Sequence, residues 1–122
     1  MSLRTAVRRA LASADEVAAD EERHEAAGNR GCVPVSELGD RRRASVAGVL
    51  RSVVLRPREG TPTVEAELYD GSGALDLVWL GRRTIAGVEP GRRIRVEGLV
   101  CDVDGRRTMF NPRYELRAKG AE

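Results

Sequence analysis

Residues 64–80 have the sequence VEAELYDGSGALDLVWL, which contains two short apolar segments joined by a tight turn. Between Val64 and Tyr69 apolar and polar residues alternate, as expected of a strand with one buried face. Asp70–Gly73 has the composition of a hairpin turn, and Leu75–Leu80 has that of a second, more apolar strand. We therefore expect an antiparallel hairpin here, inside a larger β-sheet.

Three further strands are expected around this hairpin, at residues 44–56, 93–103 and 106–116. The first has a central Gly48, which indicates a bulge or a tight bend, and the last is interrupted at Asn111-Pro112. Residues 81–91 form a short helical or irregular connection between the third and fourth strands. Five strands with a connection at that point match the plan of the OB-fold, so we expect an all-β, five-stranded OB-fold Greek-key barrel.

In the first part of the chain the apolar residues recur at the spacing of a helix and not at the alternating spacing of a strand. Leu3, Val7 and Leu11 recur at helical spacing, which predicts a helix over residues 3–27. Its apolar stripe is narrow and rich in alanine, so the helix is marginal alone and must pack on the barrel, on another copy or on a partner. The expected organisation is a helical extension and connector (1–43), a barrel (44–116) and a tail (117–122).

Composition limits the classes of protein. The 122 residues suffice for one domain, and no run of apolar residues is long enough to span a membrane. The start of the chain does not have the apolar core of a secretory signal, so we expect a cytoplasmic location in which Cys32 and Cys101 stay reduced as small buried hydrophobes. A net charge of +2 is not the marked excess typical of proteins that bind phosphates by charge alone.

Several segments resemble a known family: Asp70–Gly73, Leu75–Leu80, Glu89–Gly91, Val96–Gly98 and Met109–Glu115. Together they are similar to OB-fold nucleic-acid-binding domains, in particular to the wedge domain of RecG-type branched-DNA helicases, over about residues 44–116. The chain also resembles small actinobacterial OB-fold proteins in which WLGRR and NPRYEL stand out. The resemblance implies a domain that binds nucleic acid. No Gly-x-x-x-x-Gly-Lys-Ser/Thr loop is present in the sequence, so we expect any role on branched DNA to be passive.

The candidate contacts to nucleic acid are arginines near strand ends and two aromatic residues. Arg82 and Arg83 follow the third strand. Arg56 and Arg58 lie at the end of the first strand and in the loop after it, and Arg106 and Arg107 lie in the turn between the fourth and fifth strands; these two loops flank the cleft of an OB-fold. Tyr69 is expected on the outer face, where it would stack on a base. Trp79 is in phase with Leu75 and Leu77, which favours the interior over stacking on a base. Phe110 and Tyr114 are expected to close the barrel.

The sequence also supports a second hypothesis. Glu65 and Glu67 share the face of Tyr69, with Asp76 nearby, and three carboxylates there repel a phosphate backbone. The alternative is therefore a protein-interaction module that uses this acidic face and the N-terminal helix. We find no catalytic constellation, no set of metal ligands around the single histidine, His24, and no cofactor fingerprint, so we expect a binding module and not an enzyme.

Overall fold

The computed structural model describes residues 31–117, so the helix expected over residues 3–27 and the last five residues lie outside the described part. Within it the strands are β1 (Arg42–Arg58), β2 (Thr61–Tyr69), β3 (Ala74–Leu80), β4 (Arg93–Val103), β5 (Arg106–Phe110) and β6 (Arg113–Leu116), preceded by a 3₁₀ helix, η1 (Val35–Glu37). No helix within residues 31–117 has the length and apolar character needed to cross a membrane.

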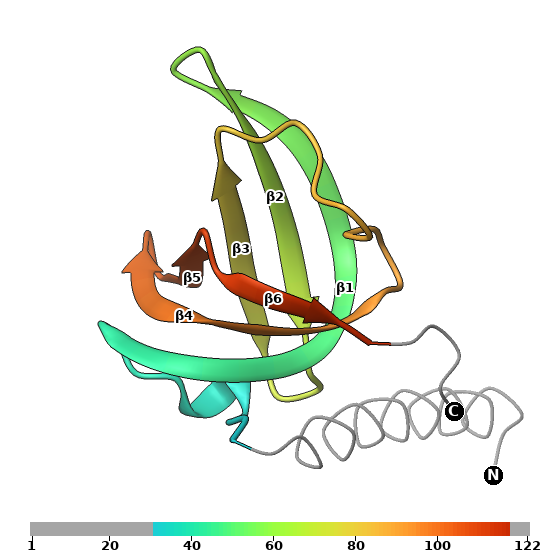
Figure 1. Ribbon diagram of the computed structural model, residues 1–122. Helices are drawn as coiled ribbons and strands as arrows, with labels where there is room; N and C mark the ends of the chain where they lie inside the picture. The colour runs from blue at the N-terminus through green and yellow to red at the C-terminus, as the bar shows by residue number, and fades with distance from the viewer. Residues whose placement is uncertain (1–30, 118–122) are drawn as a thin grey trace, which may run out of the picture.

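The sheet closes on itself. Its strand order is β1-β2-β3-β5-β4, and β4 also pairs with β1, which completes the barrel shown in Figure 1. All pairings between these strands are antiparallel except β3 with β5, which is parallel. The expected all-β architecture is confirmed, and residues 81–92 connect β3 to β4 without a helix or strand.

The last expected strand is divided at the interruption that the sequence contains. β5 pairs with β3 and β4, whereas β6 pairs with β4 alone. Asn111 adopts a positive φ of 50°, and its backbone N–H donates to Val78 O at 2.6 Å. Pro112 has no N–H to contribute to a ladder. The chain therefore leaves β3 after Phe110 and continues along β4.

Gly48 lies where β1 passes from one neighbour to the other. Residues 42–49 of β1 pair with β4, and residues 49–58 pair with β2. A Cβ atom at Gly48 would lie 2.5 Å from the carbonyl oxygen of Tyr69, which no side chain tolerates. Of the two alternatives predicted for Gly48, the change of partner strand there fits the tight bend, and the register shift, a bulge or irregularity, follows between Leu50 and Ser52.

The barrel interior is filled by the apolar side of each strand. Its largest fully buried side chains are Leu50, Leu68, Leu75, Leu77, Ile94 and Met109. Cys32 and Cys101 are free and only half-buried, which corrects the expectation that both are core residues.

One carboxylate is buried at the end of the barrel where β2 meets β3. The Asp70 side chain accepts hydrogen bonds from the backbone N–H of Val35 at 2.8 Å, of Ser72 at 2.9 Å and of Gly73 at 3.2 Å. The Ser72 hydroxyl donates to the same carboxylate at 2.7 Å. Asp70 thus shapes the hairpin turn and holds η1 against the core, and these donors compensate its burial.

Candidate functional site

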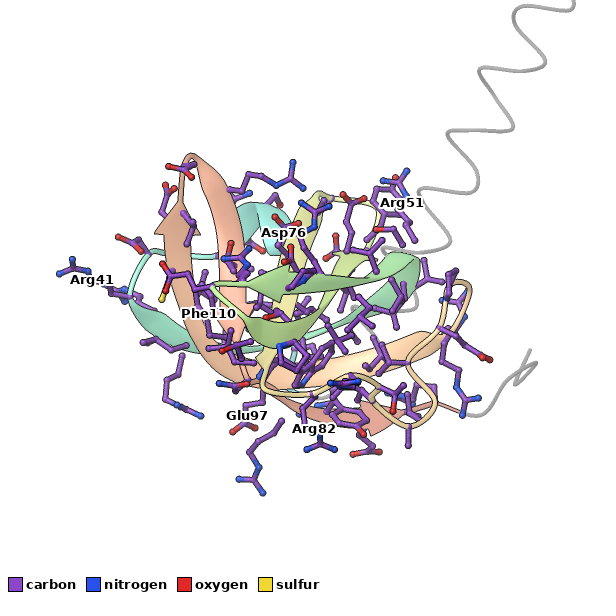
Figure 2. All side chains as sticks on the ribbon, turned by 90° about the horizontal axis from the view of Figure 1, so that it is seen from above. Arg41, Arg51, Asp76, Arg82, Glu97 and Phe110 are labelled. Carbon is purple, nitrogen blue, oxygen red and sulfur yellow. The ribbon has the colours of Figure 1, made fainter. Side chains whose placement is uncertain are left out.

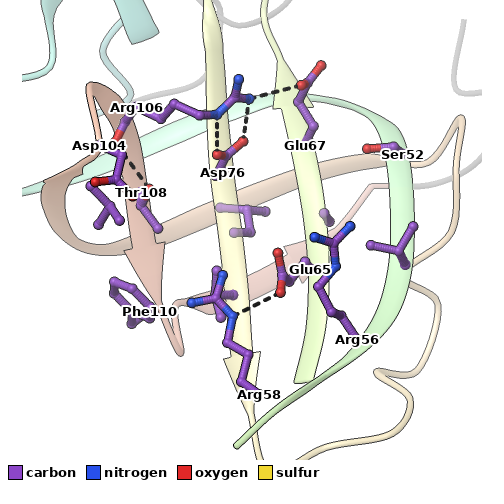
Figure 3. Close-up of a pocket in the computed structure, with 15 residues that line it drawn as sticks. Ser52, Arg56, Arg58, Glu65, Glu67, Asp76, Asp104, Arg106, Thr108 and Phe110 are labelled. Atoms are coloured by element: carbon purple, nitrogen blue, oxygen red, sulfur yellow. Dashed lines mark hydrogen bonds and ion pairs between the residues drawn. The ribbon is translucent and has the colours of Figure 1, made fainter. Parts of the chain in front are cut away.

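A groove of about 390 Å³ runs over the outer face of β2, β3 and β5. The tip of the β1–β2 hairpin contributes Arg56 and Arg58 to it, and the turn between β4 and β5 contributes Asp104 (Figure 3). Because successive side chains of a strand point to opposite faces, the inward apolar residues of β2 and β3 leave polar ones facing the groove.

The register aligns the outward residues in two rows across four strands. One row runs from Val54 through Glu65 and Val78 to Phe110. The next row runs from Ser52 through Glu67 and Asp76 to Thr108. All eight side chains belong to residues that line the groove. The first row is therefore apolar apart from Glu65, and the second is polar throughout.

Glu67 and Asp76 lie directly opposite each other, a placement that is destabilising for two like charges. Arg106 offsets the repulsion. Its Nε and Nη2 donate to the two oxygens of Asp76 at 2.6 Å and 2.9 Å, and Nη2 also donates to Glu67 Oε2 at 3.3 Å. Hydrogen bonding to Asp76 and its charge raise the pKa of Arg106 above its ordinary value.

Arginines also neutralise the other carboxylate positions on this face. Arg58 Nε donates to Glu65 Oε2 at 3.0 Å, which raises the pKa of Arg58 above its ordinary value. Arg51 lies 3.7 Å from Glu67 Oε1 and places its guanidinium carbon 3.7 Å from the centre of the Tyr69 ring. The three carboxylates expected to repel phosphate are therefore each paired with a cation.

Two side chains in the groove, Arg56 and Phe110, take no part in these ion pairs. Arg56 makes no ion pair or hydrogen bond with its side chain within residues 31–117. Phe110 is 37% exposed at the end of its row, which corrects the prediction that it closes the barrel. The local signal that could have placed Phe110 outward is alternation, because its neighbour Met109 is buried.

The structure separates the other predicted residues from the groove. Trp79 is 5% exposed in the core; its Nε1 donates to Pro112 O at 3.2 Å and its ring meets Tyr114 edge-on, with 5.8 Å between ring centroids. Of the two orientations considered for Trp79, the structure has the interior one, so the ring has no free face for a base. Arg107 donates to Ser36 O at 3.4 Å, beside the groove.

Arg82 and Arg83 are exposed in the connection after β3 and do not line the groove. Figure 2 shows Arg82 on the side of the barrel away from Asp76 and Arg51. The reason is that β3 ends at Leu80 and the chain turns at Gly81, whose φ is 74°. The eight predicted residues therefore do not form one surface.

The fold is similar to that of two solved structures. One is RecG bound to a three-way DNA junction, with 20% identity and a TM-score of 0.61 over 76% of this chain and 13% of that one. The barrel is an OB-fold. A replication protein A heterotrimer bound to ssDNA is similar to it at 14% identity and a TM-score of 0.50, over 75% of this chain and 69% of that one. No protein-family model and no curated protein sequence matches the chain. This OB-fold thus spans about an eighth of the RecG chain.

Proposed function

We propose that this OB-fold binds single-stranded nucleic acid, free or at a DNA branch, along the groove on β2, β3 and β5. The observation that carries the proposal is an exposed phenyl ring, Phe110, in a groove with arginines on both flanks. OB-folds bind oligonucleotides on this face, between the loops that join β1 to β2 and β4 to β5. The likeness to structures of RecG and replication protein A that contain DNA supports the same function.

Each group in the groove has a distinct role in this proposal. Phe110 stacks on a base, because every base has an aromatic face and stacking tolerates any sequence. Arg56 and Arg58 contact phosphates on the hairpin side of the groove, and Arg106 does so on the side of the β4–β5 turn. Tyr69 lies under Arg51, so that pair extends the surface beyond Glu67.

The charges in the groove determine how binding depends on salt. Three arginines and four carboxylates line it, so its formal charge is −1. Arg58 and Arg106 contact phosphate while they remain paired with carboxylates, and only Arg56 is an unpaired cation there. Each neutralised phosphate of a single strand contributes roughly −0.7 to the slope of log K against log salt. We therefore expect a shallow slope, of about −2 or less steep.

Fluorescence anisotropy tests the proposal with the full chain and labelled single-stranded DNA, single-stranded RNA and a forked duplex, at low and moderate salt. Arg56→Glu is expected to weaken binding to the preferred probe. Arg82→Glu is the matched control, since Arg82 is also an exposed arginine but lies on the other side of the barrel. If no probe binds at low salt, the proposal is wrong. If Arg82→Glu weakens binding more than Arg56→Glu, the surface is misassigned.

A second candidate function is recognition of a protein segment. The formal charge of −1 and the row of Glu67 and Asp76 favour a basic segment in the groove. The N-terminal segment, residues 1–27, is the other element of that hypothesis. Light scattering of the full chain and of a chain without residues 1–27 tests this hypothesis. If self-association persists after the deletion, residues 1–27 do not mediate it.

A further inference from the structure

Two carboxylates on the groove floor each retain an oxygen that accepts no hydrogen bond. Glu65 accepts the Arg58 hydrogen bond on Oε2, and Glu67 accepts the Arg106 hydrogen bond on Oε2. Within residues 31–117 no hydrogen bond reaches Oε1 of either residue; Oε1 of Glu67 has the longer ion-pair contact with Arg51 at 3.7 Å, and Oε1 of Glu65 has none. The two side chains are only 19% and 30% exposed. Each therefore presents a partly desolvated acceptor to whatever occupies the groove.

An ionised carboxylate accepts hydrogen bonds and cannot donate them. A phosphate group meets it as a second acceptor with the same charge, so phosphates are excluded from the floor and remain at the arginines on the flanks. A neutral N–H donor suits the free oxygen and leaves the ion pair with Arg58 intact. The floor of the groove is thus complementary to the edges of bases.

The cross-strand row places a stacking group and an acceptor in line. Val78 separates Phe110 on β5 from Glu65 on β2, and the three side chains face the same groove. Val78 is only 2% exposed, so a base whose face lies against Phe110 passes above β3 with its polar edge toward Glu65. Figure 3 shows Glu65 and Phe110 on the two sides of β3, with the Arg58 side chain over β3 between them and bonded to Glu65.

The four bases differ in what that edge offers. Cytosine and adenine carry exocyclic amino groups that donate, and guanine adds an amino donor, whereas thymine presents a carbonyl oxygen at the matching position. Thymine and uracil keep one ring N–H on this edge, but it lies between two carbonyl oxygens, so a carboxylate that approaches it also meets two acceptors, whereas an amino group offers two donors. We propose that Glu65, with Glu67 in the next row, makes the groove select bases with an exocyclic amino group over thymine and uracil. This inference rests on the proposed function.

The test measures the ratio of the affinities for two oligonucleotides of different base. A substitution that changes the charge of the groove alters both affinities in the same way, so this general electrostatic effect cancels in the ratio. The full chain is titrated into labelled DNA homopolymers of about twelve nucleotides, within the size range of an OB-fold site. DNA is used because the ribose 2′-hydroxyl of RNA is a further donor. Oligo-dC and oligo-dA are expected to bind at least about fivefold more tightly than oligo-dT.

Glu65→Gln then tests the assigned residue. A glutamine amide both donates and accepts, so it satisfies thymine as well as cytosine, and the dC-to-dT affinity ratio is expected to fall to about one. Glu115→Gln, an exposed carboxylate on β6 outside the groove, is the control and retains the wild-type ratio. Glu67→Gln is the second variant if Glu65→Gln does not fold by circular dichroism.

The outcomes separate the two proposals. If the wild-type chain binds oligo-dT as tightly as oligo-dC, base selection is refuted and nucleic-acid binding stands. If Glu65→Gln and Glu67→Gln strengthen binding to both oligomers and leave the ratio unchanged, the carboxylates repel phosphate without reading bases, and the inference is wrong. If neither oligomer binds, the proposed function itself fails.

Discussion

Replacing Phe110 with alanine is expected to weaken binding of single-stranded nucleic acid about fivefold. The stacking of a base on an aromatic side chain is worth about 1–3 kcal/mol by alanine substitution. Phe110 is 37% exposed, so only part of the ring is available, and the lower value of about 1 kcal/mol applies. Since about 1.4 kcal/mol corresponds to a factor of ten in Kd, this loss corresponds to about fivefold.

Tyr114 provides a matched control. It is also 37% exposed, but it lies on β6, packs edge-on against Trp79 and does not line the groove. Tyr114→Ala removes an aromatic ring of equal exposure and is expected to leave Kd unchanged. Both substitutions uncover apolar area and are expected to cost about 1–2 kcal/mol of unfolding free energy. The melting temperatures are therefore measured first, and binding is compared where both variants are folded.

Fluorescence anisotropy at low salt gives the two dissociation constants. A Phe110→Ala chain that binds within about twofold of the wild type, under conditions where Arg56→Glu weakens binding, refutes the stacking role. If Phe110→Ala and Tyr114→Ala lose affinity equally, binding responds to the general stability of the barrel, and the assignment of Phe110 as the stacking residue is wrong.

Four further predictions concern the barrel itself. Gly48→Ala is expected to lose about 3 kcal/mol of unfolding free energy in urea, because the new Cβ overlaps backbone; an unchanged midpoint contradicts this. Asp70→Ala is expected to lose about 3 kcal/mol, since the buried N–H of Val35 loses its acceptor, and a loss below about 1 kcal/mol would refute it. The fluorescence of Trp79 is expected to resist quenching by iodide, with and without an oligonucleotide, whereas strong quenching would place the ring at the surface. Burial raises the pKa of the Cys32 thiol above its ordinary value, against the attraction of nearby cations. Less thiolate is then present below that pKa, so alkylation of Cys32, measured with the other cysteine replaced by serine, is expected to be slow at neutral pH and to accelerate in alkali; rapid labelling at neutral pH contradicts it.

Local patterns account for most of the strands. Alternation over residues 64–69 predicted both β2 and its outward carboxylates, and Asn111-Pro112 predicted where the last strand is interrupted. The bend at Gly48 could also be predicted from the sequence, because a glycine inside an apolar strand marks by itself a position where no side chain fits. Alternation along the next strand likewise predicted that Trp79 faces the interior with Leu75 and Leu77. These features depend on neighbours within a few residues.

The sequence by itself thus determined which segments are strands and most of the side chains that face the interior, with Phe110 and the two cysteines as exceptions, since the two faces of a strand are set by local backbone geometry. Only the tertiary structure decided which outward residues meet. The parallel pairing of β3 with β5 brings Phe110 into line with Glu65 and places Arg106 on Asp76, across 45 and 30 positions of the chain. The turn after β3 carries Arg82 to the opposite side. Such contacts join residues far apart in sequence, so their geometry exists only when the barrel is closed.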